Sequence, residues 1–288
     1  MGMQINTNVS ALNSYRNLSN TQNDLSKSLE KLSSGLRINR AADDAAGLAI
    51  SEGLRSQVSG LKVAARNAQD GISVIQTAEG GLTEVHSILQ RVRDLAVQAG
   101  NDSNNAKSRE AITTEVTALA DELIRISDTT NFNGINLLDA SAGAATDGKI
   151  SFQVGAGSGA DSQIAVDLGA AGIDIKTLAT DLKTAIVTTD GFASATVAAA
   201  TIGTVDTAIE SVSDGRAALG AVQNRFESTI NSLNVSAENL QAAESRIRDT
   251  DMASEMVNYT RSNILSQAGT AMLAQANQSN QGVLQLLR

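Results

Sequence analysis

The stretch from Leu54 to Ala99 constrains the fold most, because its apolar residues recur at alternating steps of four and three. They are Leu54, Val58, Leu61, Ala65, Ala68, Ile72 and Ile75 and, after a slip of one residue, Ala78, Leu82, Val85, Leu89, Val92 and Ala96. This spacing is typical of a helix that packs lengthwise on other helices. A helix from Asp44 to Ala99 would be about 80 Å long, so it needs a partner of similar length.

Two other segments supply such partners. A second long stripe begins near Thr204 and consists of Val205, Ile209, Val212, Leu219, Val222, Phe226, Ile230, Leu233, Ala237, Leu240 and Ile247. A shorter helix is expected from about Ala106, with its stripe at Ile112, Val116, Leu119, Leu123 and Ile126. The turn at 101–105 is short, so this helix should run antiparallel to the first.

The two ends of the chain predict weaker helices over residues 4–34 and 253–287. Their apolar stripes are thin and lie among Asn, Ser, Thr and Gln, so packing on the same chain alone would stabilise them poorly. Asn6, Thr7 and Asn8 are candidate N-caps, and Gly35 is a helix stop. Asp43 and Asp44 are expected to cap the long helix. The same carboxylate pair could begin a metal site, but no third ligand lies nearby in the sequence.

The character of the chain changes between about Ile135 and Gly203. Residues 150–154 and 164–168 alternate apolar and polar side chains around the loop GAGSGADSQ, which predicts a β-hairpin. A short helix is expected at 176–187, and 190–203 is ambiguous. Because residues 141–203 lack the long stripe, we expect them to face outward and to tolerate change.

Composition excludes several classes of function. The chain has no cysteine and no proline, only 2% aromatic residues and a net charge of −9, which disfavours nucleic-acid binding and removes thiol chemistry. No run of about 20 apolar residues is present, so no membrane span is expected. His86 lies inside the long stripe and is interpreted as structural. We therefore expect no catalytic residue, no cofactor and no metal site.

These patterns predict a mainly α fold: long antiparallel coiled-coil-like rods, terminal helices and a small central segment with a β-hairpin. Residues 1–40 with 249–288 would form a terminal helical domain. Residues 41–140 with 204–248 would form a helical rod domain, and 141–203 a variable outer segment.

Long motifs at both ends resemble bacterial flagellin. They are INTN at 5–8, LEKLSSGLRINRAADDAAGLAIS at 29–51, QDGISVIQTAEGGLTEVHSILQRVRDLAVQAGN at 69–101, FNGINLL at 132–138, LGAVQNRFESTINSL at 219–233, ENLQAAESRIRDTDMASEM at 238–256 and ILSQAGTAMLAQANQSNQGVLQLLR at 264–288. The resemblance implies a short flagellin without large outer domains, exported unfolded by the flagellar secretion apparatus and located outside the cell in the filament.

The resemblance also implies partners and sites. The partners are further copies of the chain, the export apparatus, a flagellin-specific chaperone on the C-terminal segment, the filament cap and hook-junction proteins, and an animal Toll-like receptor. The receptor site would comprise Gln90, Arg91, Leu95 and Glu115, with Leu95 beside the packed seam rather than in it. Subunit packing is assigned to the apolar positions of the two ends: Val9, Leu12, Leu18, Leu25, Leu29, Leu32, Ile264, Leu265, Ala268, Met272 and Leu273.

Weak terminal helices suggest a mechanism of assembly. Ordering a residue costs roughly 1–2 kcal/mol of backbone entropy, which thin stripes in water offset poorly. We expect the ends to fold when they are buried against neighbouring subunits. A cytosolic coiled-coil scaffold and a hook-filament junction protein are the alternatives considered.

Overall fold

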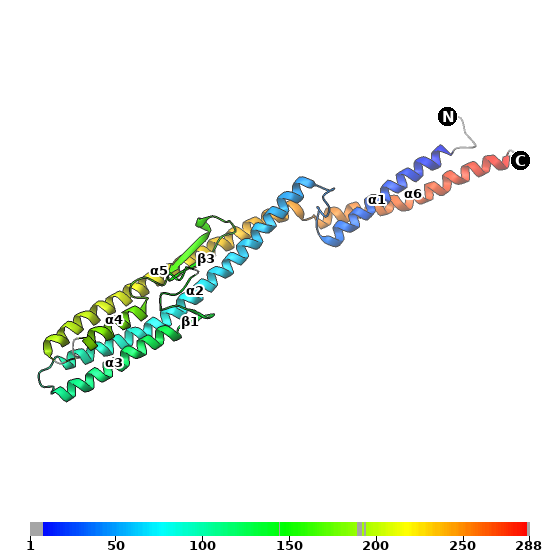
Figure 1. The fold of residues 1–288 in the computed structure, drawn as a ribbon. Coiled ribbons are helices and arrows are strands. Elements are labelled where there is room, and N and C mark those ends of the chain that lie inside the picture. Colours follow the sequence, from blue (N-terminus) through cyan, green and yellow to red (C-terminus); the bar gives the residue numbers. More distant parts are fainter. Residues whose placement is uncertain (1–7, 144, 189–191, 193, 287–288) are drawn as a thin grey trace. The chain divides into compact units, whose positions relative to one another are not determined.

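The computed structural model describes residues 8–143, 145–188, 192 and 194–286, and most of them are helical (Figure 1). The helices are α1 (Val9–Ser34), α2 (Ala45–Ala99), α3 (Ala106–Thr129), α4 (Ile175–Thr188), α5 (Ala195–Arg248) and α6 (Met252–Leu286). The strands are β1 (Asn131–Phe132), β2 (Ile135–Asn136), β3 (Lys149–Gln153) and β4 (Gln163–Asp167), with a 3-10 turn at Ala160–Ser162 before β4. The mainly α fold with a small hairpin is confirmed. The second long helix begins at Ala195, earlier than the expected Thr204.

The chain divides into two units. One contains the residues up to Val58 and those from Glu238 onward, and the other is Ser59–Ala237. Helices α2 and α5 contribute residues to both. The three-part division drawn from the sequence remains a prediction.

The core of the Ser59–Ala237 unit is built on the α2 stripe. From Ala68 onward, the stripe residues of α2 are buried and join one apolar cluster with α3 and α5. Figure 1 shows α2, α3, α4 and α5 side by side in this unit. Ion pairs flank the cluster, among them Arg93 Nε to Asp206 Oδ1 at 2.6 Å between α2 and α5. The stripe therefore marks the face on which its partners pack.

The β3–β4 hairpin docks on the helices through one face. The strands are antiparallel, with Ile150 opposite Val166 and Phe152 opposite Ile164. The rings of Phe152 and Phe226 meet edge to face, with centroids 5.6 Å apart. Asn67 of α2 donates its side-chain amide to the Gln153 carbonyl at 3.0 Å. The hairpin is thus anchored to both α2 and α5.

Helix α4 is also part of the core. Lys176 Nζ lies 2.9 Å from Asp128 Oδ1, and Lys183 pairs with Asp121, so two ion pairs join α4 to α3. Residues 141–203 contribute buried apolar side chains to the same cluster: Ala142, Val154, Ile164, Val166, Leu168, Ile173, Ile175, Ala179, Leu182, Ile186, Phe192 and Ala198. This segment therefore packs inward along much of its length, which differs from the expectation that it only faces outward.

In the other unit, the α1–α2 connection is tied to the α5–α6 connection. Leu36 and Asp249 form an antiparallel bridge, and Arg37 donates Nη2 to the Ile247 carbonyl at 2.7 Å. Gly35 ends α1 with φ +74°, as expected of a helix stop. These contacts fix where α1 leaves the connection.

The two aspartates before α2 have different roles. Asp44 caps α2, because its Oδ1 accepts from the Gly47 amide at 2.8 Å. Asp43 does not cap the helix and so differs from the expectation. Its carboxylate accepts from the backbone amides of Arg40 and Asn39, and these bonds hold the pKa of Asp43 below its usual 3.8. Asp43 closes the connecting turn instead.

Candidate subunit interface

Helices α1 and α6 form an antiparallel pair whose seam places a few large side chains among small and polar residues. Asn8 Nδ2 donates to the Ala276 carbonyl at 2.9 Å, while the other end of α1 approaches Asp249. Within α1, the buried residues are Leu18 and Ser28. The remaining seam positions are only half-buried. A pair packed this thinly leaves most of its apolar surface free.

The large apolar side chains of this pair point outward. Each is between 48% and 64% exposed. On α1 they are Val9, Leu12, Tyr15 and Leu29, and on α6 they are Met252, Met256, Val257, Ile264, Leu265 and Met272. Exposed apolar groups gathered on one element are typical of a surface that meets a partner.

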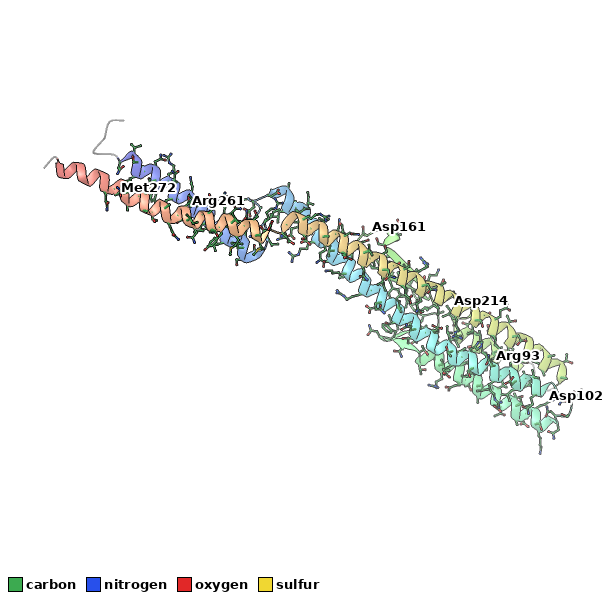
Figure 2. All side chains as sticks on the ribbon, turned by 180° about the vertical axis from the view of Figure 1, so that it is seen from behind. Arg93, Asp102, Asp161, Asp214, Arg261 and Met272 are labelled. Carbon is green, nitrogen blue, oxygen red and sulfur yellow. The ribbon has the colours of Figure 1, made fainter. Side chains whose placement is uncertain are left out.

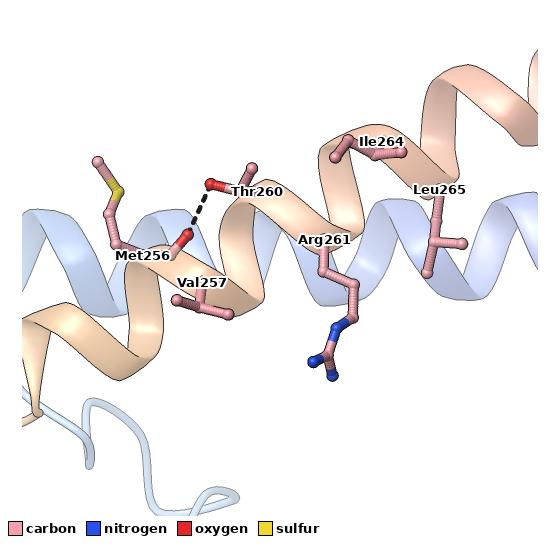
Figure 3. Close-up of a pocket in the computed structure, with 6 residues that line it drawn as sticks. All are labelled: Met256, Val257, Thr260, Arg261, Ile264 and Leu265. Atoms are coloured by element: carbon pink, nitrogen blue, oxygen red, sulfur yellow. Dashed lines mark hydrogen bonds between the residues drawn. The ribbon is translucent and has the colours of Figure 1, made fainter.

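A shallow groove of about 490 Å³ lies along this face of α6 (Figure 3). Val257, Arg261 and Leu265 form one row of the groove at steps of four residues. Met256, Thr260 and Ile264 form the next row, and Thr260 Oγ1 donates to the Met256 carbonyl at 2.8 Å. The groove is apolar apart from Arg261 and Thr260.

Charge is sparse on α6. Its 35 residues include only two charged side chains, Glu255 and Arg261. Arg261 and Met272 can be located on α6 in Figure 2. The cores of protein interfaces are depleted in charge in the same way, because an unpaired charge is costly to desolvate. Composition and exposure therefore both suit contact with another protein.

The structure separates the predicted packing residues into two groups. Val9, Leu12, Leu29, Ile264, Leu265, Ala268 and Met272 are exposed, and Leu25, Leu32 and Leu273 are half-buried. Leu18 is 8% exposed and contacts α6 of its own chain. The single stripe expected on α1 is therefore two faces. Leu18, Leu25 and Leu32 recur every seven residues and turn toward α6, whereas Val9, Leu12 and Leu29 point outward.

Four exposed apolar residues of this pair lie outside the packing positions predicted from the sequence. Met252, Met256 and Val257 lie near the polar junction 248–251, and Tyr15 lies among Asn, Ser and Arg residues. Tyr15 follows Leu12 by three residues, so the two share a face of α1. That spacing was the available signal.

The predicted receptor residues lie on the other unit and only partly come together. Arg91 donates Nη2 and Nε to Glu115 Oε1 at 2.6 and 3.1 Å, so α2 and α3 are joined there. Gln90 is exposed, with its amide nitrogen 2.9 Å from His86 Nε2. All three functional groups of this patch, those of Arg91, Glu115 and Gln90, reach the surface.

Leu95 does not lie beside the packed seam, and that expectation is wrong. Its side chain is 2% exposed, and its neighbour Ala96 is fully buried. Helix α2 packs against both α3 and α5 at this level, so its buried face is wider than one stripe. Leu95 can support the positions of Arg91 and Glu115 but is not an exposed contact.

No group of three or more His, Cys, Asp or Glu side chains is arranged to hold a metal ion within the part of the chain that is described. Across the same residues, no helix combines the length and apolar character needed to cross a membrane.

Comparisons with known proteins agree along the whole chain. The bacterial flagellin N-terminal helical region matches residues 5–143, and the bacterial flagellin C-terminal helical region matches residues 202–287. A flagellin of Halalkalibacterium halodurans is 52% identical, covering 99% of this chain and all of its own length. A flagellin of Bacillus subtilis is 53% identical over 99% of this chain and all of its own length. The crystal structure of Bacillus cereus flagellin is 32% identical and covers 62% of this chain and 94% of its own, with a TM-score of 0.46.

Proposed function

The chain belongs to the bacterial flagellin family, and from this premise we propose that the outward apolar faces of α1 and α6 are the surfaces through which one subunit meets the next. The chain is a structural subunit that polymerises into the extracellular flagellar filament. Full-length similarity to flagellins gives no support to a cytosolic scaffold or a hook-filament junction protein.

The observation that carries the proposal is the outward position of the large apolar residues. Ile264 and Met272 are 61% and 62% exposed, whereas the seam with α1 consists mostly of small or polar residues. Full burial of such a side chain is worth roughly 1.5–3 kcal/mol, so about half of that remains to be gained at each position. A neighbouring subunit is the partner that can supply this burial repeatedly.

The arrangement also favours an open polymer. The apolar faces belong to two different helices, α1 and α6. The apolar face of one subunit can therefore pack on a different apolar face of the next subunit. Such head-to-tail contacts generate a helical filament when the rotation does not close.

Substitution at Leu265 tests the proposed interface. Leu265→Asn places a polar group of similar size in the groove and should abolish filaments while leaving the monomer folded, because the amide would be buried without a partner. The matched control Leu265→Met keeps the volume and apolar character and should assemble. Negative-stain electron microscopy and circular dichroism measure both properties. Normal filaments from Leu265→Asn would contradict the proposal.

The remaining partners are proposed from family membership. They are the flagellar export apparatus, the filament cap and the hook-junction proteins. For a flagellin chaperone, the apolar groove of α6 offers a suitable surface. We also retain the three-part division of 1–40 with 249–288, 41–140 with 204–248, and 141–203 as a proposal about domain roles.

The Toll-like receptor site is proposed with a changed role for Leu95. Gln90, Arg91 and Glu115 would contact the receptor, and Leu95 would hold α2 in place beneath them. Arg91→Ala should then weaken receptor binding roughly tenfold, as expected of a moderate hot spot. Binding of the monomer to purified receptor measures this effect, and unchanged affinity would remove Arg91 from the site.

A further inference from the structure

One position of the α1–α6 pair interlocks a large side chain with a glycine. A Cβ atom built on Gly269 of α6 would lie 3.1 Å from Leu18 Cδ1 and 3.7 Å from Leu18 Cβ. Leu18 is also the most buried apolar side chain in the described part of α1. Leu18 therefore fills a notch that exists because residue 269 has no side chain.

This contact aligns the two helices. On α1 the half-buried and buried seam positions step by three and four: Ala11, Ser14, Leu18, Thr21, Leu25, Ser28 and Leu32. Read in the opposite direction, α6 has seam positions with the same steps: Ala276, Leu273, Gly269, Ser266, Ser262, Tyr259 and Glu255. With Leu18 opposite Gly269, every position of one series is level with its counterpart in the other.

The same alignment places large side chains level with small ones. Ser14 is then level with Leu273, Leu25 with Ser262, and Ser28 with Tyr259. Ala11 is level with Ala276 and Thr21 with Ser266, and such small residues tolerate sliding, while the last level pairs Leu32 with Glu255. A shift of seven residues would preserve the spacing of the seam while moving α1 about 10.5 Å along α6.

We propose that the insertion of Leu18 into the Gly269 notch fixes the register of α1 against α6 and so determines the apolar surface that the next subunit meets. The bridge between Leu36 and Asp249 holds one end of the pair, and the hydrogen bond from Asn8 to the Ala276 carbonyl ties the other end. Leu18 lies between these two contacts, 18 residues from Leu36 or about five helical turns, where it adds an apolar anchor. This inference rests on the proposed interface, because the register matters through the outward faces of both helices.

Engineered disulfides can report the register, because the chain contains no cysteine. The pair Thr21→Cys with Ser266→Cys is level in the observed register. The pairs Ser14→Cys with Ser266→Cys and Ser28→Cys with Ser266→Cys report slips of seven residues in either direction. Filaments of each variant are oxidised mildly, and cross-links within one chain are separated from those between chains by denaturing electrophoresis. Only the level pair should cross-link efficiently within a chain.

Gly269→Leu then removes the notch. We expect one of two results. Either filaments are lost, or the yield of the disulfide between residues 21 and 266 falls at least fivefold and the filament shape changes. The double variant Leu18→Ala with Gly269→Leu moves the large side chain to the other helix and should restore assembly and the level cross-link. Gly53→Leu is the control, because Gly53 is a helical glycine of the same unit with nothing within 4 Å of a built Cβ.

Three results would overturn the inference. They are an inefficient level cross-link in the unsubstituted background, an unchanged cross-link and filament shape in Gly269→Leu, or no restoration by the double variant. Failure of the parent chain itself to form filaments would instead contradict the proposed function, so the two failures are distinguishable.

Discussion

At the scale of single residues, glycine determines how closely α5 approaches α2. Gly71 is buried, and a Cβ atom there would lie 2.8 Å from Phe226 Cζ. Phe226 is fully buried and also contacts Phe152, so its ring cannot move without disturbing the hairpin. Gly80 lies on the same helix with nothing within 4 Å of a built Cβ.

We predict opposite effects of alanine at these two glycines. Gly71→Ala should destabilise the monomer by about 1–3 kcal/mol through overpacking. The higher helix propensity of alanine offsets part of this loss. Gly80→Ala should stabilise the monomer by up to about 1 kcal/mol, because only the propensity changes. Thermal unfolding followed by circular dichroism measures both. A stabilised Gly71→Ala variant would show that the contact with Phe226 relaxes freely.

A second residue-scale prediction concerns pH and Asp43. The folded-state pKa of Asp43 is lowered by bonds from the backbone amides of Arg40 and Asn39. Its stabilising contribution is therefore present above the ordinary pKa of 3.8 and is lost as pH falls through the lower folded value. Asp43→Ala should lower the urea midpoint at neutral pH and should match the parent at a pH well below 3.8. An equal difference at both pH values would contradict this linkage.

At the scale of elements, the hairpin combines packed strands with a free position in its loop. Phe152 of β3 packs on Phe226, and Asn67 bonds to the Gln153 carbonyl. At the tip of the loop, Gly159 has nothing within 4 Å of a built Cβ. The packed strands should therefore resist change and the tip should accept it.

This contrast gives the third prediction. Phe152→Ala should destabilise the monomer by about 3 kcal/mol through loss of a packed ring. Two glycines inserted between Ser158 and Gly159 should change stability by less than about 1 kcal/mol, since longer loops cost little entropy. Thermal unfolding and filament formation are measured for both variants. A destabilised insertion variant with no filaments would place the tip in an interface.

Periodicity predicted the elements well but not their surroundings. The three-four steps located α2 and α3, and alternation located β3 and β4. Periodicity says which side of a helix is buried but not how many partners cover it, so Leu95 was placed outside a seam that includes it. The packing of residues 141–203 was missed for the same reason, because contacts such as Phe152 on Phe226 join positions far apart in sequence.

At the scale of the whole molecule, the two units differ in how much apolar surface they bury. The Ser59–Ala237 unit contains a continuous core of fully buried side chains. In α1, by contrast, the buried residues are Leu18 and Ser28. Local stability in proteins follows buried contacts, so opening should be far easier in α1 and α6 than in the core. The sequence shows the thin apolar stripes of the two ends. Which of their residues face the α1–α6 seam and which face outward depends on how α1 is aligned with α6, and periodicity alone does not determine that alignment.

The last prediction follows from this difference. In the monomer, backbone amides of α1 and α6 should exchange with deuterium at least a hundredfold faster than those around Leu82 and Val85, which are fully buried in the core. In the filament, burial of the outward apolar faces should slow exchange in α1 and α6 strongly and leave the core little changed, because ordering and assembly are coupled. Hydrogen exchange with mass spectrometry on both forms measures the two regions at once. Strong protection of α1 and α6 already in the monomer would mean that the terminal pair folds without its neighbours, and assembly would then join preformed surfaces.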